Sequence, residues 1–252
     1  MRAISASFAA LLLAALTAGA AIAASPASPV DSASVFPAGV SATWSDSLPH
    51  LPLIEFPVAV DSGQWMAVHL TGDGGLSVTD KGIGRTLAAN GIPTVELNTL
   101  RYFFKRRTPD RAAQDLTRIL RHYLPAWNRQ KVVLVGYSMG ADVLPFLISR
   151  LPEDLRGRVG LVVFIGLAHA ADFHIHLRGF LGHPGKDALP VGPELEKLRG
   201  IKMVCFYAAR DGHSLCRSLP ADLVTCTEMS GRHRVGRNYG EITRAILDGT
   251  GR

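Results

Sequence analysis

Two kinds of hydrophobic pattern alternate along this chain, one typical of buried strands and one typical of helices. Several stretches are almost continuously apolar, as expected of strands that are buried on both faces, and we predict strands at 53–60, 65–70, 92–97, 131–135, 159–165, 201–207 and 223–227. Between these stretches the apolar residues recur at helical spacing, which predicts helices at 79–89, 109–127, 141–151 and 239–247. This alternation predicts an α/β fold with a mostly parallel sheet and helices on both faces. The segment 169–193 has no strong period, and we expect a small lid or insertion there.

The beginning of the chain has the composition of an export signal. Met1 and Arg2 precede an uncharged stretch rich in Ala and Leu, which ends in Ala21-Ile22-Ala23. This pattern predicts a signal peptide over 1–23 and a periplasmic protein; an uncleaved membrane anchor is the alternative. Residues 24–43, rich in Ala, Ser and Pro, are expected to be a flexible lead-in, and 44–252 a single domain.

Charge and cysteine content add two expectations. The formal net charge is +6, and basic residues gather at 101–111 and 232–237. Such clusters favour anionic surfaces, including lipid headgroups and nucleic acid, although a solvated basic face is an equal alternative. Of the three cysteines, Cys205 lies in an apolar run, whereas Cys216 and Cys226 lie in or beside loops. In an oxidising compartment we therefore expect Cys216 to pair with Cys226.

The chemistry of the chain centres on Gly136-Tyr137-Ser138-Met139-Gly140. In a chain with 25 glycines, a Gly-x-Ser-x-Gly pattern alone is weak, but here a predicted strand runs into it and a predicted helix leaves it. That context is typical of the sharp turn that carries the nucleophile of an α/β-hydrolase fold. The sequence therefore predicts that Ser138 is the nucleophile of a serine hydrolase.

A serine nucleophile needs a base and an orienting acid, which in this fold follow it in the order acid, then histidine. Asp211 follows the predicted strand at 201–207, and His233 follows the one at 223–227. Asp172 is the second candidate for the acid, and His213 is expected to be a lid or surface residue on the loop of the acid. Three other histidines precede the last strands and are in the wrong order for the base: His169, His174 and His176.

Backbone amides must also stabilise the oxyanion of the tetrahedral intermediate. The expected donors are the amides of Met139 and of Asp73, the latter in the glycine-rich turn at 71–75. We expect four residues to contact the substrate: Gly72, Gly74, Tyr137 and Asp142. The histidine-rich stretch at 169–183 lacks the spacing of zinc ligands, so no metal or other cofactor is expected.

Several segments resemble the family of the bacterial virulence protein VirJ and the C-terminal half of its relative AcvB. The matching segments are 69–75 (HLTGDGG), 100–103 (LRYF), 107–109 (RTP), 133–146 (VLVGYSMGADVLPF), 171–176 (ADFHIH) and 179–182 (GFLG). The resemblance implies a periplasmic α/β hydrolase with Ser138 as nucleophile. It implies, for AcvB-like members, hydrolysis of aminoacyl-phosphatidylglycerol, chiefly the lysyl form, and for VirJ-like members an accessory role in type IV secretion and DNA transfer.

Two sets of partners follow from the two implied activities. A lipid esterase would take its substrate from an anionic phospholipid membrane, and the protein would be periplasmic and peripheral on the inner membrane. An accessory protein would bind proteins of the secretion system, and a hydrolase of another ester is a third alternative. We expect neither nucleic acid nor metal as a partner.

Overall fold

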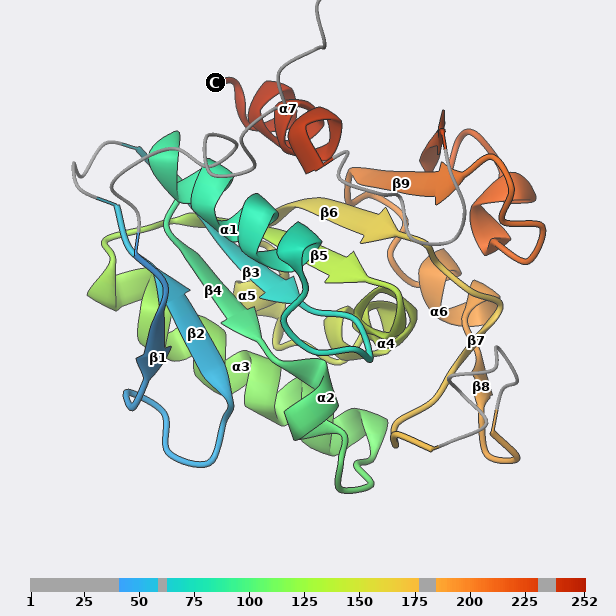
Figure 1. The fold of residues 1–252 in the computed structure, drawn as a ribbon, viewed down its shortest axis with the longest axis horizontal. Coiled ribbons are helices and arrows are strands. Elements are labelled where there is room, and N and C mark those ends of the chain that lie inside the picture. The colour runs from blue at the N-terminus through green and yellow to red at the C-terminus, as the bar shows by residue number, and fades with distance from the viewer. Residues whose placement is uncertain (1–40, 59–62, 177–184, 231–238) are drawn as a thin grey trace, which may run out of the picture. The chain divides into compact units, whose positions relative to one another are not determined.

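The computed structural model describes residues 41–58, 63–176, 185–230 and 239–252 (Figure 1). The strands are β1 (Thr43–Ser45), β2 (Leu53–Phe56), β3 (Trp65–Leu70), β4 (Thr94–Leu97), β5 (Lys131–Tyr137), β6 (Val159–Ile165), β7 (Ala170–Ala171), β8 (Leu189–Pro190), β9 (Met203–Ala208) and β10 (Thr225–Met229). The helices are α1 (Val78–Ala89), α2 (Thr99–Tyr102), α3 (Pro109–Ala126), α4 (Met139–Ile148), α5 (Glu153–Arg156), α6 (Gly192–Glu196) and α7 (Tyr239–Thr250), with a 3-10 turn, η3, at Leu215–Arg217.

The main sheet has the strand order β1-β2-β4-β3-β5-β6-β9-β10. The six strands from β4 to β10 are parallel, whereas β2 pairs antiparallel with β4, and β1 antiparallel with β2. The carboxyl ends of the parallel strands meet at one edge, because Leu70 is in register with both Leu97 and Gly136, and Tyr137 with Ile165. We call this edge of the sheet the site edge. The predicted α/β fold with a mostly parallel sheet is confirmed.

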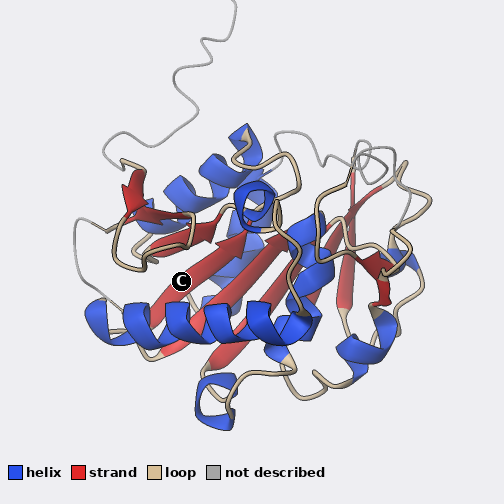
Figure 2. Ribbon diagram, turned by 90° about the horizontal axis from the view of Figure 1, so that it is seen from below, coloured by secondary structure: helices blue, strands red, loops and turns tan. Residues whose placement is uncertain are grey.

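Helices cover both faces of the sheet (Figure 2). On β5, Val132 and Leu134 belong to the core beneath α3 and α4, whereas Val133 and Val135 belong to the core beneath α1 and α7. This alternation is the period of a strand that is buried on both sides. Helix α3 begins where the sequence indicated, with Thr108 as its N-cap and Pro109 in its first turn.

Some predicted boundaries differ from the structure, and one strand of the main sheet was not predicted. Strand β2 ends at Phe56, and Pro57 follows it; proline lacks the N–H that would continue a ladder. Strand β1 was not predicted, since its three residues, Thr43 to Ser45, have no apolar run. It forms because the edge of β2 offers free backbone groups, with Trp44 in register with Ile54.

The predicted insertion at 169–193 begins and ends in a small antiparallel sheet. Ala170 pairs with Pro190 and Ala171 with Leu189, and α6 follows. Residues 177–184 lie outside the described part of the chain. No helix within the described ranges is long and apolar enough to cross a membrane.

The predicted disulfide is wrong. Cys205 on β9 is bonded to Cys216 in η3, with 6.1 Å between their Cα atoms, and Cys226 is free. The prediction treated Cys205 as a buried strand residue without a partner. In fact η3 folds back against β9 and brings Cys216 into the same core, whereas Cys226 lies within strand β10, in register with Cys205.

Candidate active site

Ser138 occupies a sharp turn between β5 and α4, at the site edge. Its φ of 51° and ψ of −120° lie far from helical values, and its amide donates a hydrogen bond to the Ile165 carbonyl at 2.8 Å. A residue other than glycine pays about 1–3 kcal/mol for such a backbone conformation, so the surrounding structure must hold it in place. The Ser138 hydroxyl makes no capping bond to α4.

The two glycines of the motif are required by close backbone packing. A Cβ at Gly136 would lie 2.6 Å from both the Gly140 carbonyl oxygen and the Ala141 Cα. A Cβ at Gly140 would lie 2.2 Å from the Leu70 carbonyl oxygen. Any side chain at either position would therefore push α4 away from the ends of β3 and β5. The turn has the geometry that the motif predicts, and the catalytic role of Ser138 remains a prediction.

The glycine-rich turn after β3 lies against Ser138. The Gly75 amide donates to the Gly72 carbonyl at 3.0 Å, which closes a tight turn with Asp73 and Gly74 at its tip. A Cβ at Gly72 would lie 3.2 Å from the Tyr137 ring and 3.6 Å from the Ser138 Cβ. The structure thus brings the expected substrate-contacting residues Gly72 and Tyr137 next to the predicted nucleophile. Gly74 is exposed and a Cβ there would meet nothing within 4 Å of the described residues.

The two expected oxyanion donors come from segments that meet at Ser138. Met139 is the first residue of α4, where the amides have no intrahelical acceptor. Asp73 lies in the turn that Gly72 begins, and its side chain is half-buried. The role of both amides remains a prediction.

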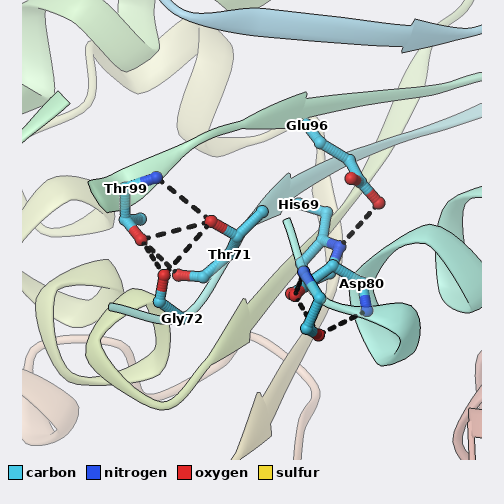
Figure 3. A network of polar contacts seen from close by, with 7 residues as sticks. His69, Thr71, Gly72, Asp80, Glu96 and Thr99 are labelled. Carbon is cyan, nitrogen blue, oxygen red and sulfur yellow. Dashed lines mark hydrogen bonds and ion pairs between the residues drawn. The ribbon is translucent and has the colours of Figure 1, made fainter. Parts of the chain in front are cut away.

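Two buried threonines hold the base of this turn (Figure 3). The Thr99 hydroxyl contacts the carbonyl oxygens of Thr71 at 2.7 Å and of Gly72 at 2.6 Å, and the Thr99 amide donates to the Thr71 hydroxyl at 3.1 Å. Neither side chain is exposed to solvent. Thr99 begins α2, so the chain after β4 fixes the turn after β3. Sequence reasoning missed this pair, since no local pattern connects the two threonines.

A second buried network lies beside the threonines in Figure 3. His69 Nδ1 lies 3.1 Å from Glu96 Oε1, and His69 Nε2 lies 3.4 Å from Asp80 Oδ1; all three side chains are fully buried. Burial lowers the pKa of His69, but the hydrogen bond and the charge of Glu96, together with Asp80, outweigh burial and raise it. Burial raises the pKa of Glu96.

This network fixes the segments on both sides of the glycine-rich turn. His69 lies on β3 just before the turn, and Asp80 lies in the first turn of α1 just after it. The Asp80 carboxylate also accepts a hydrogen bond from the Ser77 amide at 2.9 Å, and the Asp80 amide donates to the Ser77 hydroxyl at 3.2 Å. The spacing Ser77-x-x-Asp80 is the signature of a capping box, so this part of the network was detectable in the sequence.

The predicted acid, Asp211, lies in the loop after β9, also at the site edge. It is 8% exposed, and its amide donates to the Ala208 carbonyl at 2.9 Å. Its carboxylate accepts a bond from the His213 amide at 3.2 Å, and its carbonyl accepts one from Arg217 Nε at 2.9 Å. The disulfide of Cys216 ties the same loop to β9. The His213 side chain is exposed, as expected of a surface residue.

Three acidic side chains act on a fourth, Asp142, near the nucleophile. Burial raises the pKa of Asp142 well above its ordinary value. A hydrogen bond from the Ala168 amide, at 2.7 Å, lowers this pKa, whereas the charges of Asp73, Asp172 and Asp211 raise it further. Asp142 lies one helical turn beyond Ser138, because its amide donates to the Ser138 carbonyl at 3.0 Å. Asp73, Asp172 and Asp211 are therefore close enough to Asp142 for their charges to act on it.

The remaining predicted residues are placed as follows. Asp172, the second candidate for the acid, forms an ion pair with His176 at 3.1 Å and accepts a bond from the Gly185 amide at 2.9 Å. His233 lies outside the described residues; β10, which precedes it, ends at Met229. Within the described ranges, no three His, Cys, Asp or Glu side chains are grouped as metal ligands.

Solved structures share this fold at low sequence identity. Est1E from Butyrivibrio proteoclasticus superposes with a TM-score of 0.60 at 10% identity, over 84% of this chain and 99% of that chain. TT1662 from Thermus thermophilus superposes with a TM-score of 0.57 at 13% identity, over 83% of this chain and 97% of that chain. A thioesterase domain from the curacin biosynthetic pathway superposes with a TM-score of 0.54 at 12% identity, over 83% of this chain and 99% of that chain. These likenesses establish the α/β-hydrolase fold.

Sequence comparisons identify the family. No curated protein matches the chain. The family described as bacterial virulence protein (VirJ) matches residues 64–252, which include the glycine-rich turn, the Ser138 turn and the Asp211 loop. The chain therefore belongs to the VirJ family of bacterial virulence proteins.

Proposed function

We propose that this protein is a periplasmic serine esterase that hydrolyses the aminoacyl ester of aminoacyl-phosphatidylglycerol, chiefly the lysyl form. The observation that carries the proposal is the strained backbone of Ser138, at φ 51°, with the Gly72 turn packed against it. Local strain of this kind is retained where it serves function, and a strand-to-helix turn that presents a serine is the nucleophile arrangement of this fold.

The reaction proceeds in two balanced steps. His233 takes the proton of the Ser138 hydroxyl, Asp211 orients His233, and Ser138 Oγ bonds to the acyl carbon of the aminoacyl group. The amides of Met139 and Asp73 stabilise the oxyanion, the ester bond to the lipid glycerol breaks, and the glycerol oxygen receives the proton from His233. Water then attacks the acyl-serine, and the free amino acid leaves while Ser138 regains its proton.

The acidic surroundings of the site support a cationic acyl group. Asp142 lies one helical turn beyond Ser138, and three further carboxylates, Asp73, Asp172 and Asp211, are close enough to raise its pKa. An ester of lysine carries two ammonium groups, and opposite charges within a partly desolvated site attract more strongly than in water. A neutral or anionic acyl group would lack this attraction.

Release of lysine from purified lysyl-phosphatidylglycerol tests the proposal. Ser138→Ala should abolish release and prevent labelling by a fluorophosphonate, while the exposed Ser47→Ala control should retain both. Undiminished release by Ser138→Ala would refute the esterase.

Two other outcomes separate the alternatives. Labelling of Ser138 without lysine release would indicate a hydrolase of another ester. A wild-type protein that resists the probe, together with full secretion activity of Ser138→Ala, would indicate an accessory protein that binds secretion partners.

A further inference from the structure

Large apolar side chains are exposed at three places in the described part of the chain. Trp44 is 56% exposed, Val78 is 53% exposed and Phe104 is 73% exposed. Single exposed apolar residues are ordinary on protein surfaces, so their number alone indicates nothing. Their position in the fold is informative.

Two of these residues, Val78 and Phe104, lie at the site edge, and Trp44 lies beside it. Val78 is the first residue of α1, directly after the glycine-rich turn and Ser77. Phe104 follows α2, the short helix to which the β4 arrow points in Figure 1. Trp44 lies beside α2, since the Arg101 guanidinium stacks over its ring at 4.9 Å. The exposed apolar residues therefore lie at or next to the edge that carries Ser138.

Phe104 projects from a rigid base. Phe103 is fully buried, and its ring packs against those of Tyr102 and Phe173, with centroids 4.8 Å and 5.8 Å away. The Ile175 amide donates to the Phe103 carbonyl and the Arg107 amide to the Phe173 carbonyl, each at 2.9 Å. The three residues between these two bonds, Phe104 to Arg106, form the tip of an anchored loop. No core packing accounts for a phenylalanine at this tip.

This loop is connected to the active site by one short segment. The residues that anchor it, Phe173 and Ile175, lie one and three residues after Asp172. The charge of Asp172 raises the pKa of Asp142, one helical turn beyond Ser138. Phe173 also packs against Phe146 of α4, with ring centroids 5.5 Å apart, so the base of the loop lies against the helix that begins directly after Ser138.

The charges around Phe104 are mainly positive. Arg101, Lys105 and Arg106 are all exposed. Arg106 pairs with Asp187 at 2.7 Å, but both side chains are about two-thirds exposed, at 65% and 70%, and such pairs contribute little. Aromatic residues favour the headgroup level of a bilayer, and basic residues are attracted to anionic lipids. The cores of protein–protein interfaces, by contrast, are depleted in lysine.

We propose that Trp44, Val78 and Phe104, with Arg101, Lys105 and Arg106, form a docking surface for an anionic phospholipid bilayer. The six residues are called the docking surface below. The proposal rests on the proposed function, because it explains how a site that cleaves a membrane lipid reaches its substrate. Phe104 enters the headgroup region, the cations contact lipid phosphates, and Ser138 faces the membrane.

Vesicle binding by the purified protein tests the docking surface. Wild-type protein should co-sediment with vesicles containing phosphatidylglycerol and not with vesicles of phosphatidylcholine alone. Lys105→Ala/Arg106→Ala should weaken binding by about fivefold for each charge removed. Phe104→Ala should weaken binding by about tenfold or more.

A matched control removes the same charge from the opposite edge of the sheet. Arg158 and Lys202 are exposed and directly precede β6 and β9, so Arg158→Ala/Lys202→Ala changes the net charge equally. This control should bind vesicles as the wild type does, and all variants should unfold at the wild-type temperature. The docking surface would be refuted if the control lost as much vesicle binding as the docking variants. It would also be refuted if the wild type bound vesicles with and without phosphatidylglycerol equally well.

Failure of docking and failure of catalysis are distinguishable. If the docking variants lose vesicle binding but Ser138→Ala still releases lysine, the docking surface is supported and the proposed esterase activity of Ser138 is refuted. If the docking variants hydrolyse lysyl-phosphatidylglycerol in vesicles as fast as wild type, the docking surface falls. Hydrolysis of the same lipid dispersed in detergent should be unchanged in these variants, because docking is then not needed.

Discussion

The substitution Gly140→Ala adds one methyl group at the point where α4 meets the end of β3. A Cβ there would lie 2.2 Å from the Leu70 carbonyl oxygen and 2.6 Å from that of Thr71. Both are backbone atoms of a buried strand end, so no side chain can rotate out of the way. Helix α4 and β3 must therefore separate by most of an ångström.

The size of the effect follows from two opposing terms. Overpacking a tight core costs about 1–3 kcal/mol, and contact with backbone places this site at the upper end. Alanine is worth up to about 1 kcal/mol more than glycine inside a helix. The free energy of unfolding should fall by about 2 kcal/mol, which lowers Tm by about 4–8 °C in a chain of this size.

The second residue of α7, Gly240, provides a matched control. Like Gly140 it is the second residue of its helix, but a Cβ there would meet no atom of the described residues within 4 Å. Thermal unfolding followed by circular dichroism should show a lower Tm for Gly140→Ala and an equal or higher Tm for Gly240→Ala.

Activity should change in the same direction. Moving α4 displaces the Met139 amide relative to the Gly72 turn, and loss of one oxyanion donor reduces kcat by about 100-fold or more. A Gly140→Ala protein that melts and reacts like the Gly240→Ala protein would refute the packing argument.

Three further predictions concern side chains around the site. Cys216→Ser removes the bond to Cys205 and should lower the free energy of unfolding by about 3 kcal/mol. Peptide mapping of the wild-type protein without reduction should recover these two cysteines joined. A peptide in which Cys216 is linked to another residue would contradict the structure. Asp142→Asn should raise Tm near neutral pH, because the raised pKa makes the ionised carboxyl unfavourable in the folded state. This gain should shrink as the pH falls toward the ordinary value of 3.8, and a gain that grows on acidification would exclude the explanation. His69→Gln should lower Tm most below pH 6.5. The pKa of His69 is raised in the folded state, so its protonated form stabilises the fold in this range. This contribution is lost as the pH rises through the raised pKa. Equal losses at about pH 6 and about pH 9 would show that the charge of His69 is unimportant.

The features that sequence analysis predicted well depend on local constraints. Strands such as β5 and β6 are buried on both faces, so nearly every residue in them is apolar. The Ser138 turn was recognisable because its two glycines are required by contacts between adjacent elements. The capping box at Ser77 is also contained within four residues, but the sequence analysis did not predict it and began the helix at 79.

The features that were missed depend on contacts between distant segments. Cys205 pairs with Cys216 only because η3 folds back against β9, and cysteine spacing does not reveal this. Thr99 supports the glycine-rich turn only because β4 lies beside β3 in the sheet. The exposure of Phe104 depends on the backbone bonds that anchor its loop to 173–175. None of these contacts leaves a periodic signal in the sequence.

The tight contacts of the Ser138 turn are made largely by main-chain atoms. The Leu70 and Thr71 carbonyls limit Gly140, and the backbone of Gly140 and Ala141 limits Gly136. Main-chain atoms are the same in every residue type, so the turn demands only that two positions lack a Cβ. Side chains around the serine can therefore be exchanged during evolution without disturbing it. The backbone of the turn can therefore stay the same while the side chains around Ser138 differ.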